Sequence, residues 1–209
     1  MGDQNALRVM HALRLKGFAD TPVIAEAAEI DEATAKQVLD GFAEQELAKY
    51  REGRMTGWMP TREGRAHGEV LLAEELDASD KRDALDAIYR RFLEHNQAFL
   101  ALCTDWQTRI VDGEQIINDH NDAEYDATIF ERLAETDQAM QPICTDLGTL
   151  LDRCASYAPR FGEALAKVQG GEIEWITKPV IDSYHTVWHE LHEDLLASLG
   201  IDRSNEGHA

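Results

Sequence analysis

Apolar residues recur at the spacing of an α-helix along most of this 209-residue chain. Strand-like sequence appears only in residues 48–51 and 55–60, which the turn Glu52-Gly53-Arg54 joins into a predicted hairpin. Hydrophobic residues make up 44% of the chain, which is enough to bury a core. The fold class that follows is mainly α, with one small β-hairpin in the first third of the chain.

Residues 1–76 are punctuated by residues that begin and end helices. Gly17 is typical of the position just after a helix, and Asp31 and Thr61 are typical of the residue that caps the start of one. The expected order is a helix over residues 5–16, a short helix over 23–28, a capped helix up to about residue 45, the hairpin, and a fourth helix that follows residue 61.

This order of elements ends in the sequence W-M-P-T-R-E-G-R-A-H at residues 58–67, and it resembles the winged helix-turn-helix domain of bacterial transcriptional regulators of the MarR and PadR type. The resemblance covers residues 5–76, about a third of the chain. It implies a DNA-binding domain whose third helix lies in the major groove and whose hairpin is the wing. The helix that usually precedes this module in MarR proteins and the Gly-Tyr-rich first turn of PadR proteins are both absent, so the resemblance is to the superfamily.

The predicted wing is the basic part of an acidic chain, whose formal net charge is −20. Residues 48–65 contain five Lys and Arg and two Asp and Glu, whereas residues 30–47 contain one base and five acids. Because basic side chains neutralise DNA phosphates, we expect phosphate contacts from the wing and base contacts from the third helix. The predicted DNA-binding residues are Thr34, Lys36, Gln37, Lys49, Arg51, Arg54 and Arg62.

The function predicted from these features is that of a transcriptional regulator that binds double-stranded DNA. A homodimer is expected, because two DNA half-sites normally require two modules. Two alternatives stay open: a winged-helix interaction or accessory protein that does not bind DNA, and a helical metal- or metabolite-binding protein. An enzyme is not expected, because the chain has no GxSxG, no P-loop and no GxGxxG after a strand.

Residues 77–200 predict an acidic antiparallel helical bundle that dimerises the protein, senses a ligand, or does both. Ile110 is assigned to the apolar face of its first helix, and Pro142 is expected to kink or divide the second. Residues 201–209 are expected to form a flexible tail. The bundle helices are expected over residues 80–110, 123–157, 159–169 and 174–199.

The last predicted helix has the most distinctive polar pattern, with His185, His189 and His192 on consecutive turns. These side chains fall within about 60° of one another on a helical wheel, beside the apolar stripe. Asn96 interrupts the apolar face of the first bundle helix, so its buried amide needs a partner, for which the histidines are the candidates. The predicted ligand-binding pocket consists of Asn96, Trp106, Gln107, His185, His189 and His192.

A structural role for these histidines, as hydrogen-bonding groups between helices, is the favoured alternative to a pocket. Three imidazoles on one straight helix would need a further ligand, such as His95 or His120, to hold a metal, so no metal site is assigned. No cofactor is expected, while a divalent metal or a small anionic effector stays open. The polar loop at residues 118–122 is expected to supply turns and a helix cap rather than metal ligands.

The cysteine pattern and the N-terminal sequence predict a cytoplasmic protein. Cys103, Cys144 and Cys154 are odd in number and lack a CxxC spacing, so neither a disulfide framework nor structural zinc is expected. The N-terminal segment has no apolar run followed by a small-residue cleavage site. No stretch approaches the roughly 20 apolar residues that cross a bilayer, so no membrane is expected as a partner.

Overall fold

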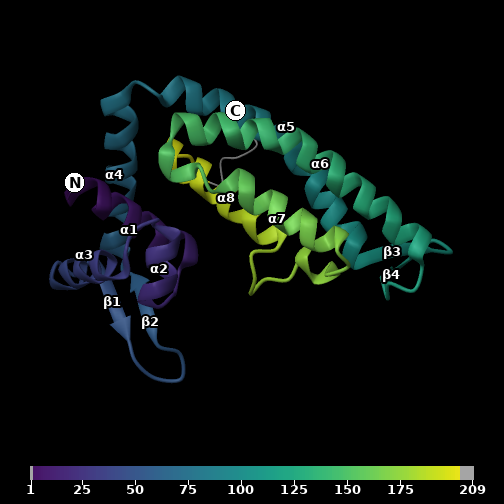
Figure 1. Cartoon of the computed structure of the whole chain (residues 1–209), viewed down its shortest axis with the longest axis horizontal. Coiled ribbons are helices and arrows are strands. Elements are labelled where there is room, and N and C mark those ends of the chain that lie inside the picture. The colour runs from purple at the N-terminus through teal and green to yellow at the C-terminus, as the bar shows by residue number, and fades with distance from the viewer. Residues whose placement is uncertain (1, 203–209) are drawn as a thin grey trace. The chain divides into compact units, whose positions relative to one another are not determined.

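Helices and two small hairpins make up residues 2–202, the part of the chain that this computed structural model describes (Figure 1). The chain divides into two units. The first unit contains the residues up to Arg82 together with those from Glu193 onward, and the second unit contains Asp83–His192. We had expected a boundary after residue 76 and a C-terminal helix that belongs wholly to the second domain, so the division differs on both points.

The first unit has the element order expected of a winged helix. The helices α3 and α4 each follow a residue whose side chain caps the helix start. Asp31 accepts a hydrogen bond from the Thr34 amide at 2.9 Å, and Thr61 accepts one from the Gly64 amide at 3.0 Å. The caps predicted at Asp31 and Thr61, the hairpin and the mainly helical class are therefore confirmed, whereas α2 is capped by Asp20 and not, as its Thr-Pro start had indicated, by Thr21. The elements are α1 (Gly2–Lys16), α2 (Thr21–Ala27), α3 (Glu32–Glu44), β1 (Ala48–Arg51), β2 (Gly57–Pro60) and α4 (Arg62–Ser79).

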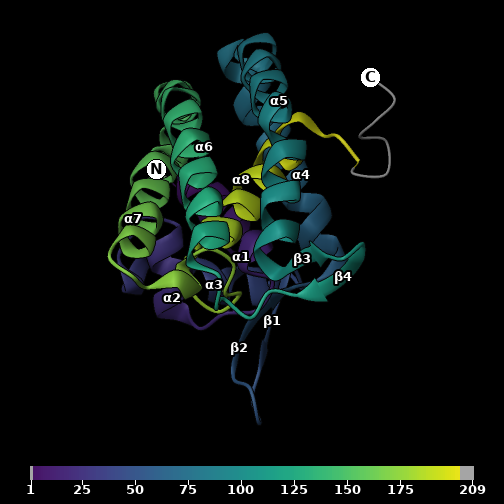
Figure 2. The same cartoon turned by 90° about the vertical axis from the view of Figure 1, so that its right-hand side faces the viewer.

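A large apolar core joins α1, α2, α3 and the β1–β2 hairpin. The buried face of α3 consists of Ala35, Leu39 and Phe42, as its helical spacing predicts, and Val38 is only partly buried. Trp58 of β2 is also buried and exchanges backbone hydrogen bonds with Ala19 at 2.7 and 3.1 Å, which ties the hairpin to the loop after α1. In Figure 2 the β1–β2 hairpin projects beyond the helices of its own unit. We call this hairpin and its connecting turn, residues 48–60, the wing.

The C-terminal end of α8 (Tyr184–Leu199) completes the first unit. Ala197 packs with Leu7 of α1 and Leu72 of α4 in a small buried cluster. Beside it, His11 Nε2 lies 3.0 Å from Asp194 Oδ2, and the Ser198 hydroxyl donates to the same carboxylate at 3.1 Å. The last turns of the chain therefore contribute both apolar and ionic contacts to this core.

The second unit is built from long antiparallel helices. Two contacts set the direction of α5 against α6: Arg91 pairs with Asp146 at 2.6 Å, and the rings of Trp106 and Phe130 lie 5.8 Å apart. Residues late in α5 thus meet residues early in α6, which confirms an antiparallel arrangement for this pair. The elements are α5 (Arg82–Gln107), β3 (Thr108–Val111), β4 (Glu114–Ile117), α6 (Ala123–Leu150), α7 (Tyr157–Gln169) and the start of α8, with single 3₁₀ turns at Asp152–Cys154 and Ile173–Trp175.

Three predictions for the second unit are wrong. Ile110 does not belong to a helix: it lies in β3, is 67% exposed, and precedes a tight turn in which Asp112 and Gly113 both have positive φ. An Asp-Gly pair with this geometry is a strong hairpin signal. The last helix begins at Tyr184 rather than at residue 174, and α6 ends at Leu150 rather than at residue 157. Pro142 does not divide α6, and the other expectation for this proline, a kink, stays a prediction.

Within the described residues, no helix has the length and apolar character needed to span a membrane. The predicted flexible tail falls mostly on residues 203–209, which lie outside the described residues. Ile201, at its start, donates a backbone hydrogen bond to Leu196 at 2.9 Å.

Candidate functional site

The outer face of the wing carries two basic side chains from one strand. Lys49 and Arg51 are two residues apart on β1, so they point to the same side of the hairpin, opposite Tyr50. Arg54 lies in the turn between the strands. All three cations are exposed, and none forms an ion pair or hydrogen bond with any other residue in the range 2–202. The wing therefore presents positive charge that no residue in the described part of the chain neutralises.

The start of α4 extends this basic surface. Arg62 and Arg65, three residues apart, are exposed on the first turns of the helix and form no ion pair with the rest of the described chain. The helix start is fixed by Thr61, whose amide donates to the Leu47 carbonyl at 3.0 Å. Gly64 permits the close approach, because a Cβ there would lie 1.9 Å from the same carbonyl oxygen.

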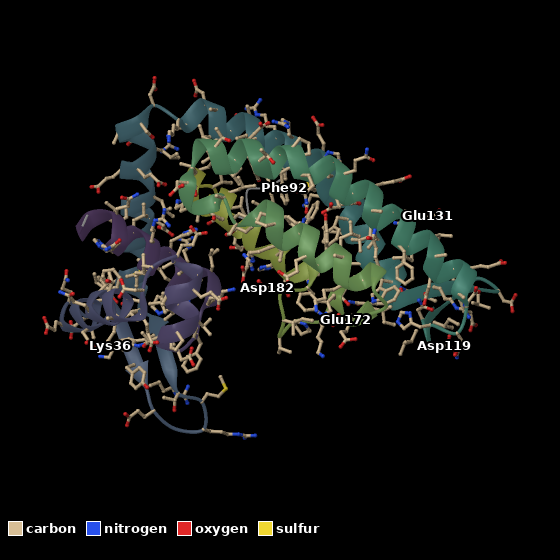
Figure 3. All side chains as sticks on the ribbon, viewed as in Figure 1. Lys36, Phe92, Asp119, Glu131, Glu172 and Asp182 are labelled. Atoms are coloured by element: carbon tan, nitrogen blue, oxygen red, sulfur yellow. The ribbon has the colours of Figure 1, made fainter. Side chains whose placement is uncertain are left out.

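The polar face of α3, the predicted recognition helix, is less available than the wing. Lys36 (labelled in Figure 3) donates to both carboxylate oxygens of Asp40 at 2.6 Å, so its charge is balanced within the helix. The Thr34 hydroxyl donates to Asp31 at 2.6 Å. Together with the hydrogen bond from the Thr34 amide, this contact lowers the pKa of the Asp31 carboxyl. Gln37 is exposed, and its amide is not bonded to any described residue.

The polar pocket predicted around Asn96 is not assembled. The Asn96 side-chain oxygen accepts a hydrogen bond from the Trp188 indole at 3.0 Å, so a tryptophan, and not a histidine, satisfies the buried amide. The Trp188 ring in turn stacks on Phe99 at 4.1 Å and contacts Phe92 at 5.0 Å. Asn96 therefore belongs to an aromatic core between α5 and α8.

The three histidines of α8 lie in three different environments. His192 is buried against Phe92, with 5.1 Å between ring centroids, while His189 is exposed to solvent. His185 is half-buried beside Phe99, and burial lowers the pKa of its imidazole below the usual value. In the described part of the chain, no group of three His, Cys, Asp or Glu side chains could hold a metal ion.

The remaining two pocket residues lie at the far end of α5. Gln107 is exposed, and its backbone carbonyl accepts a hydrogen bond from the Asn118 amide at 2.9 Å. Trp106 is buried against the His120 ring at 4.0 Å. Trp106 and Gln107 therefore adjoin the polar loop at residues 118–122 rather than the histidines of α8.

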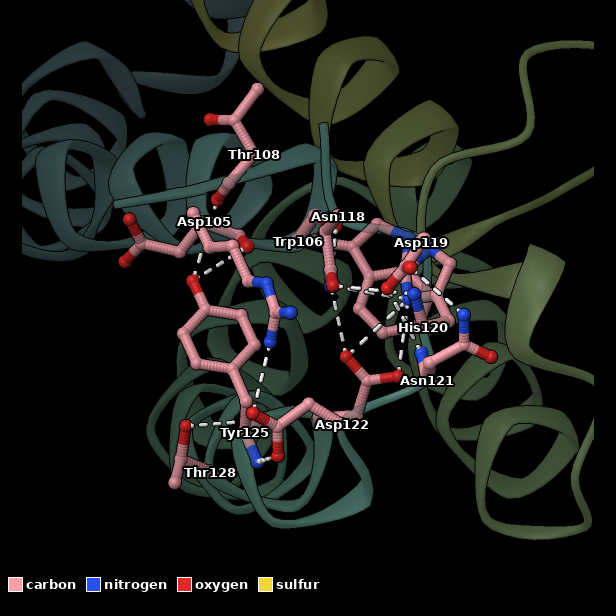
Figure 4. Close-up of polar contacts among 12 residues, drawn as sticks. Asp105, Trp106, Thr108, Asn118, Asp119, His120, Asn121, Asp122, Tyr125 and Thr128 are labelled. Carbon is pink, nitrogen blue, oxygen red and sulfur yellow. Dashed lines mark hydrogen bonds and ion pairs between the residues drawn. The ribbon is translucent and has the colours of Figure 1, made fainter. Parts of the chain in front are cut away.

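That loop, whose residues 118–122 are labelled in Figure 4, is held by the buried carboxylate of Asp126. Asn118 donates to Asp126 at 2.9 Å, and His120 Nδ1 lies 3.1 Å from the other oxygen of this carboxylate. Asp122 accepts a hydrogen bond from the Tyr125 amide and so caps α6. The predicted role in turn and cap chemistry is confirmed, whereas the buried network behind it was not foreseen.

An open cavity of about 460 Å³, which no sequence pattern had indicated, lies between the end of α5, the β3–β4 hairpin and the start of α6. Arg109 and Arg132 both line it. Arg109 had been assigned to the last turn of a long helix, and the Asp-Gly turn is the signal that would have placed it on a hairpin.

We find no match to this chain among protein-family models, curated proteins or solved structures.

Proposed function

We propose that the first unit binds double-stranded DNA through the wing and the start of α4, and that the protein is a transcriptional regulator. The observation that carries the proposal is the set of basic side chains there that have no partner among residues 2–202. Elsewhere in this unit, Arg8, Arg14 and Lys36 are paired with carboxylates at 3.4, 3.1 and 2.6 Å. The unpaired cations are Lys49, Arg51, Arg54, Arg62 and Arg65.

Phosphate neutralisation supplies much of the affinity of a protein for DNA, and it requires cations that are exposed and not already neutralised. The wing meets both conditions in a chain of net charge −20. Charges more than about 8–10 Å apart are screened at physiological salt, so only acids close to the contact would repel the DNA strongly. In this proposal α3 lies in the major groove, where the free amide of Gln37 is able to recognise adenine.

The test measures binding of the full chain to mixed genomic DNA fragments by fluorescence anisotropy at several salt concentrations. The double variant Arg51→Ala, Arg54→Ala removes two proposed phosphate contacts. The slope of log K against log salt should therefore fall in magnitude by about 1.8, at roughly 0.9 for each contact. The matched control is Arg90→Ala, Arg91→Ala on α5, which removes the same charge from the second unit.

The control variant should retain the salt slope and affinity of the wild type. Equal losses in both double variants would show that only the net charge of the chain matters, and would contradict an interface on the wing. An unchanged slope in the wing variant would contradict the assignment of Arg51 and Arg54.

A second candidate function is a protein-interaction module. The observation that favours it is the apolar surface of the wing, where Tyr50 is 49% exposed and Met55 is 63% exposed. Wild-type protein that fails to bind DNA even at low salt would favour this candidate over DNA binding.

A homodimer is part of the proposed function, because recognition of two half-sites requires two winged helices. Light scattering of the full chain should give twice the mass of one chain. A monomer that binds a two-half-site DNA as tightly as a single half-site would contradict this part of the proposal.

A further inference from the structure

The cavity in the second unit brings together side chains from three elements. The end of α5, both strands of the β3–β4 hairpin and the start of α6 line an open pocket of about 460 Å³, a volume within the range of small-molecule sites. The polar loop at residues 118–122 connects two of these elements, β4 and α6. Its lining consists of Thr104, Asp105, Thr108, Arg109, Ile110, Gln115, Tyr125, Thr128, Ile129 and Arg132.

The charged groups that line this cavity are the guanidinium groups of Arg109 and Arg132 and the carboxylate of Asp105. Arg109 of β3 donates to Asp122 at 2.9 Å, and Arg132 of α6 donates to Asp105 at 2.7 Å. Each of these contacts engages one terminal nitrogen of a group that has five N–H donors. The Nε atom of Arg109 is buried and has no hydrogen-bond partner within residues 2–202. Donor capacity is therefore left over at both arginines.

The neutral polar groups of the lining are already used by the protein. The Tyr125 hydroxyl donates to the Asp105 carbonyl at 2.9 Å, and the Thr108 hydroxyl donates to the Thr104 carbonyl at 2.9 Å. Gln115 donates to the Thr108 hydroxyl, also at 2.9 Å. The spare hydrogen-bonding capacity thus lies mainly with the guanidinium groups, which favours an anion over a neutral ligand.

Apolar surface distinguishes this cavity from a site for a simple inorganic anion. Ile129 is buried, and Ile110, which also lines the cavity, is 67% exposed on a hairpin whose Val111, Ile116 and Ile117 are exposed as well. A hydrated inorganic anion would leave this apolar surface in water, whereas a ligand with a short hydrocarbon chain would cover it. Guanidinium groups bind carboxylates through two parallel N–H···O bonds.

We propose that this cavity binds a small organic dicarboxylate, with its two carboxylates at Arg109 and Arg132 and its carbon chain against Ile110 and Ile129. The site is distinct from the pocket predicted around Asn96, and it does not depend on whether the first unit binds DNA. Arg109 lies on β3 and Arg132 lies on α6, so a ligand with two anionic groups can contact both side chains better than a ligand with one anionic group.

The experiment is calorimetric titration of the full chain with glutarate, with its neutral diamide glutaramide, and with inorganic phosphate. Glutarate should bind saturably and raise the melting temperature by mass action, while glutaramide should do neither. Arg132→Gln should weaken glutarate binding roughly ten- to a hundred-fold, because a charge-assisted hydrogen bond is lost. Arg109→Gln should weaken it to a similar extent.

Arg91→Gln is the matched control, because Arg91 pairs with Asp146 at 2.6 Å on the same two helices, α5 and α6, and does not line the cavity. It removes one charge from the same unit and should leave glutarate affinity unchanged. Arg109 also holds the capping residue of α6, so Arg109→Gln is first checked by circular dichroism. If that variant fails to fold, Arg132→Gln and Arg132→Lys, which keeps the charge without the planar fork, provide the test.

Three results would overturn the proposal. The first is wild-type affinity for glutarate in Arg132→Gln. The second is binding of phosphate or glutaramide as tight as that of glutarate, which would remove the role of the carbon chain or of the charge. The third is no binding of glutarate at about 10 mM, where a site with a dissociation constant near 1 mM would be mostly filled.

Discussion

The contact between α4 and the Leu47 carbonyl predicts a strong effect for one added methyl group. A Cβ on Gly64 would lie 1.9 Å from the Leu47 oxygen and 2.8 Å from its carbon, whereas contacts shorter than 3.0 Å essentially never occur. The same oxygen accepts hydrogen bonds from the Thr61 amide at 3.0 Å and from the Thr61 hydroxyl at 3.1 Å. In Gly64→Ala, the start of α4 must therefore move by about 1.1 Å away from a carbonyl that holds it.

Three contributions determine the size of this effect. Forcing a group into a packed contact costs about 1–3 kcal/mol. Weakening two hydrogen bonds to the Leu47 carbonyl costs about 0.5–1.5 kcal/mol each. The better helix propensity of alanine returns about 1 kcal/mol. The net expectation is a loss of about 3 kcal/mol in the free energy of unfolding of the first unit.

Urea unfolding of the full chain, followed by far-ultraviolet circular dichroism, measures this loss, and hydrogen exchange over residues 32–60 assigns it to the first unit. Gly41→Ala in α3 is the matched control, because nothing lies within 4 Å of its added Cβ. That variant should be more stable than wild type by up to about 1 kcal/mol. A Gly64→Ala variant as stable as the wild type would refute the reasoning.

Three further predictions concern the second unit. Burial raises the pKa of Cys103 and of Cys144 to about 12. In the folded protein at about pH 8, neither thiol should therefore react with a thiol reagent faster than the protein unfolds. Rapid labelling of either cysteine would contradict this prediction. Burial lowers the pKa of His185 below 6.5 in the folded state, so protonation favours unfolding. The wild type should therefore lose stability relative to His185→Gln as the pH falls below about 6.5. A difference in urea midpoint between the two proteins that is the same at about pH 7.5 and about pH 5.5 would contradict this prediction. Trp188→Phe leaves the buried Asn96 oxygen without its donor and should cost about 1–3 kcal/mol in thermal or urea unfolding, whereas a neutral effect would mean that this hydrogen bond does not stabilise the fold.

The sequence predicted those parts of the fold that depend on neighbouring residues. The cap of α3 by Asp31, the cap of α4 by Thr61 and the wing all follow from signals within a few residues. The β3–β4 hairpin was missed because the apolar phase of α5 continues through Ile110 into the strand, so periodicity outweighed the Asp-Gly turn signal. The bridge between Ala19 and Trp58 joins residues too far apart in sequence for any local pattern to reveal it.

The candidate sites show the same limit. A charge count over a window was enough to locate the basic wing, and the spacing of Lys36 and Asp40 could have indicated their pairing on one helix face. The need of Asn96 for a partner was predictable from its position in an apolar stripe, but the identity of that partner was not, because Trp188 is 92 residues away. Arg109 and Arg132 likewise meet at one cavity only because α5, the hairpin and α6 fold back on one another.

The participation of Asp194 and Ala197 in the first unit has a consequence for the order in which the protein matures during synthesis. About 110 residues separate Arg82 from Glu193, so at roughly 5–20 residues per second the ribosome completes this unit some 5–20 seconds after its helical framework has emerged. Until then His11 and Leu7 lack the acid and the alanine that cover them. A nascent chain therefore acquires its finished first unit only after residues 193–199 have emerged, and a chain that stops before them would lack contacts in the part of the protein that was made first.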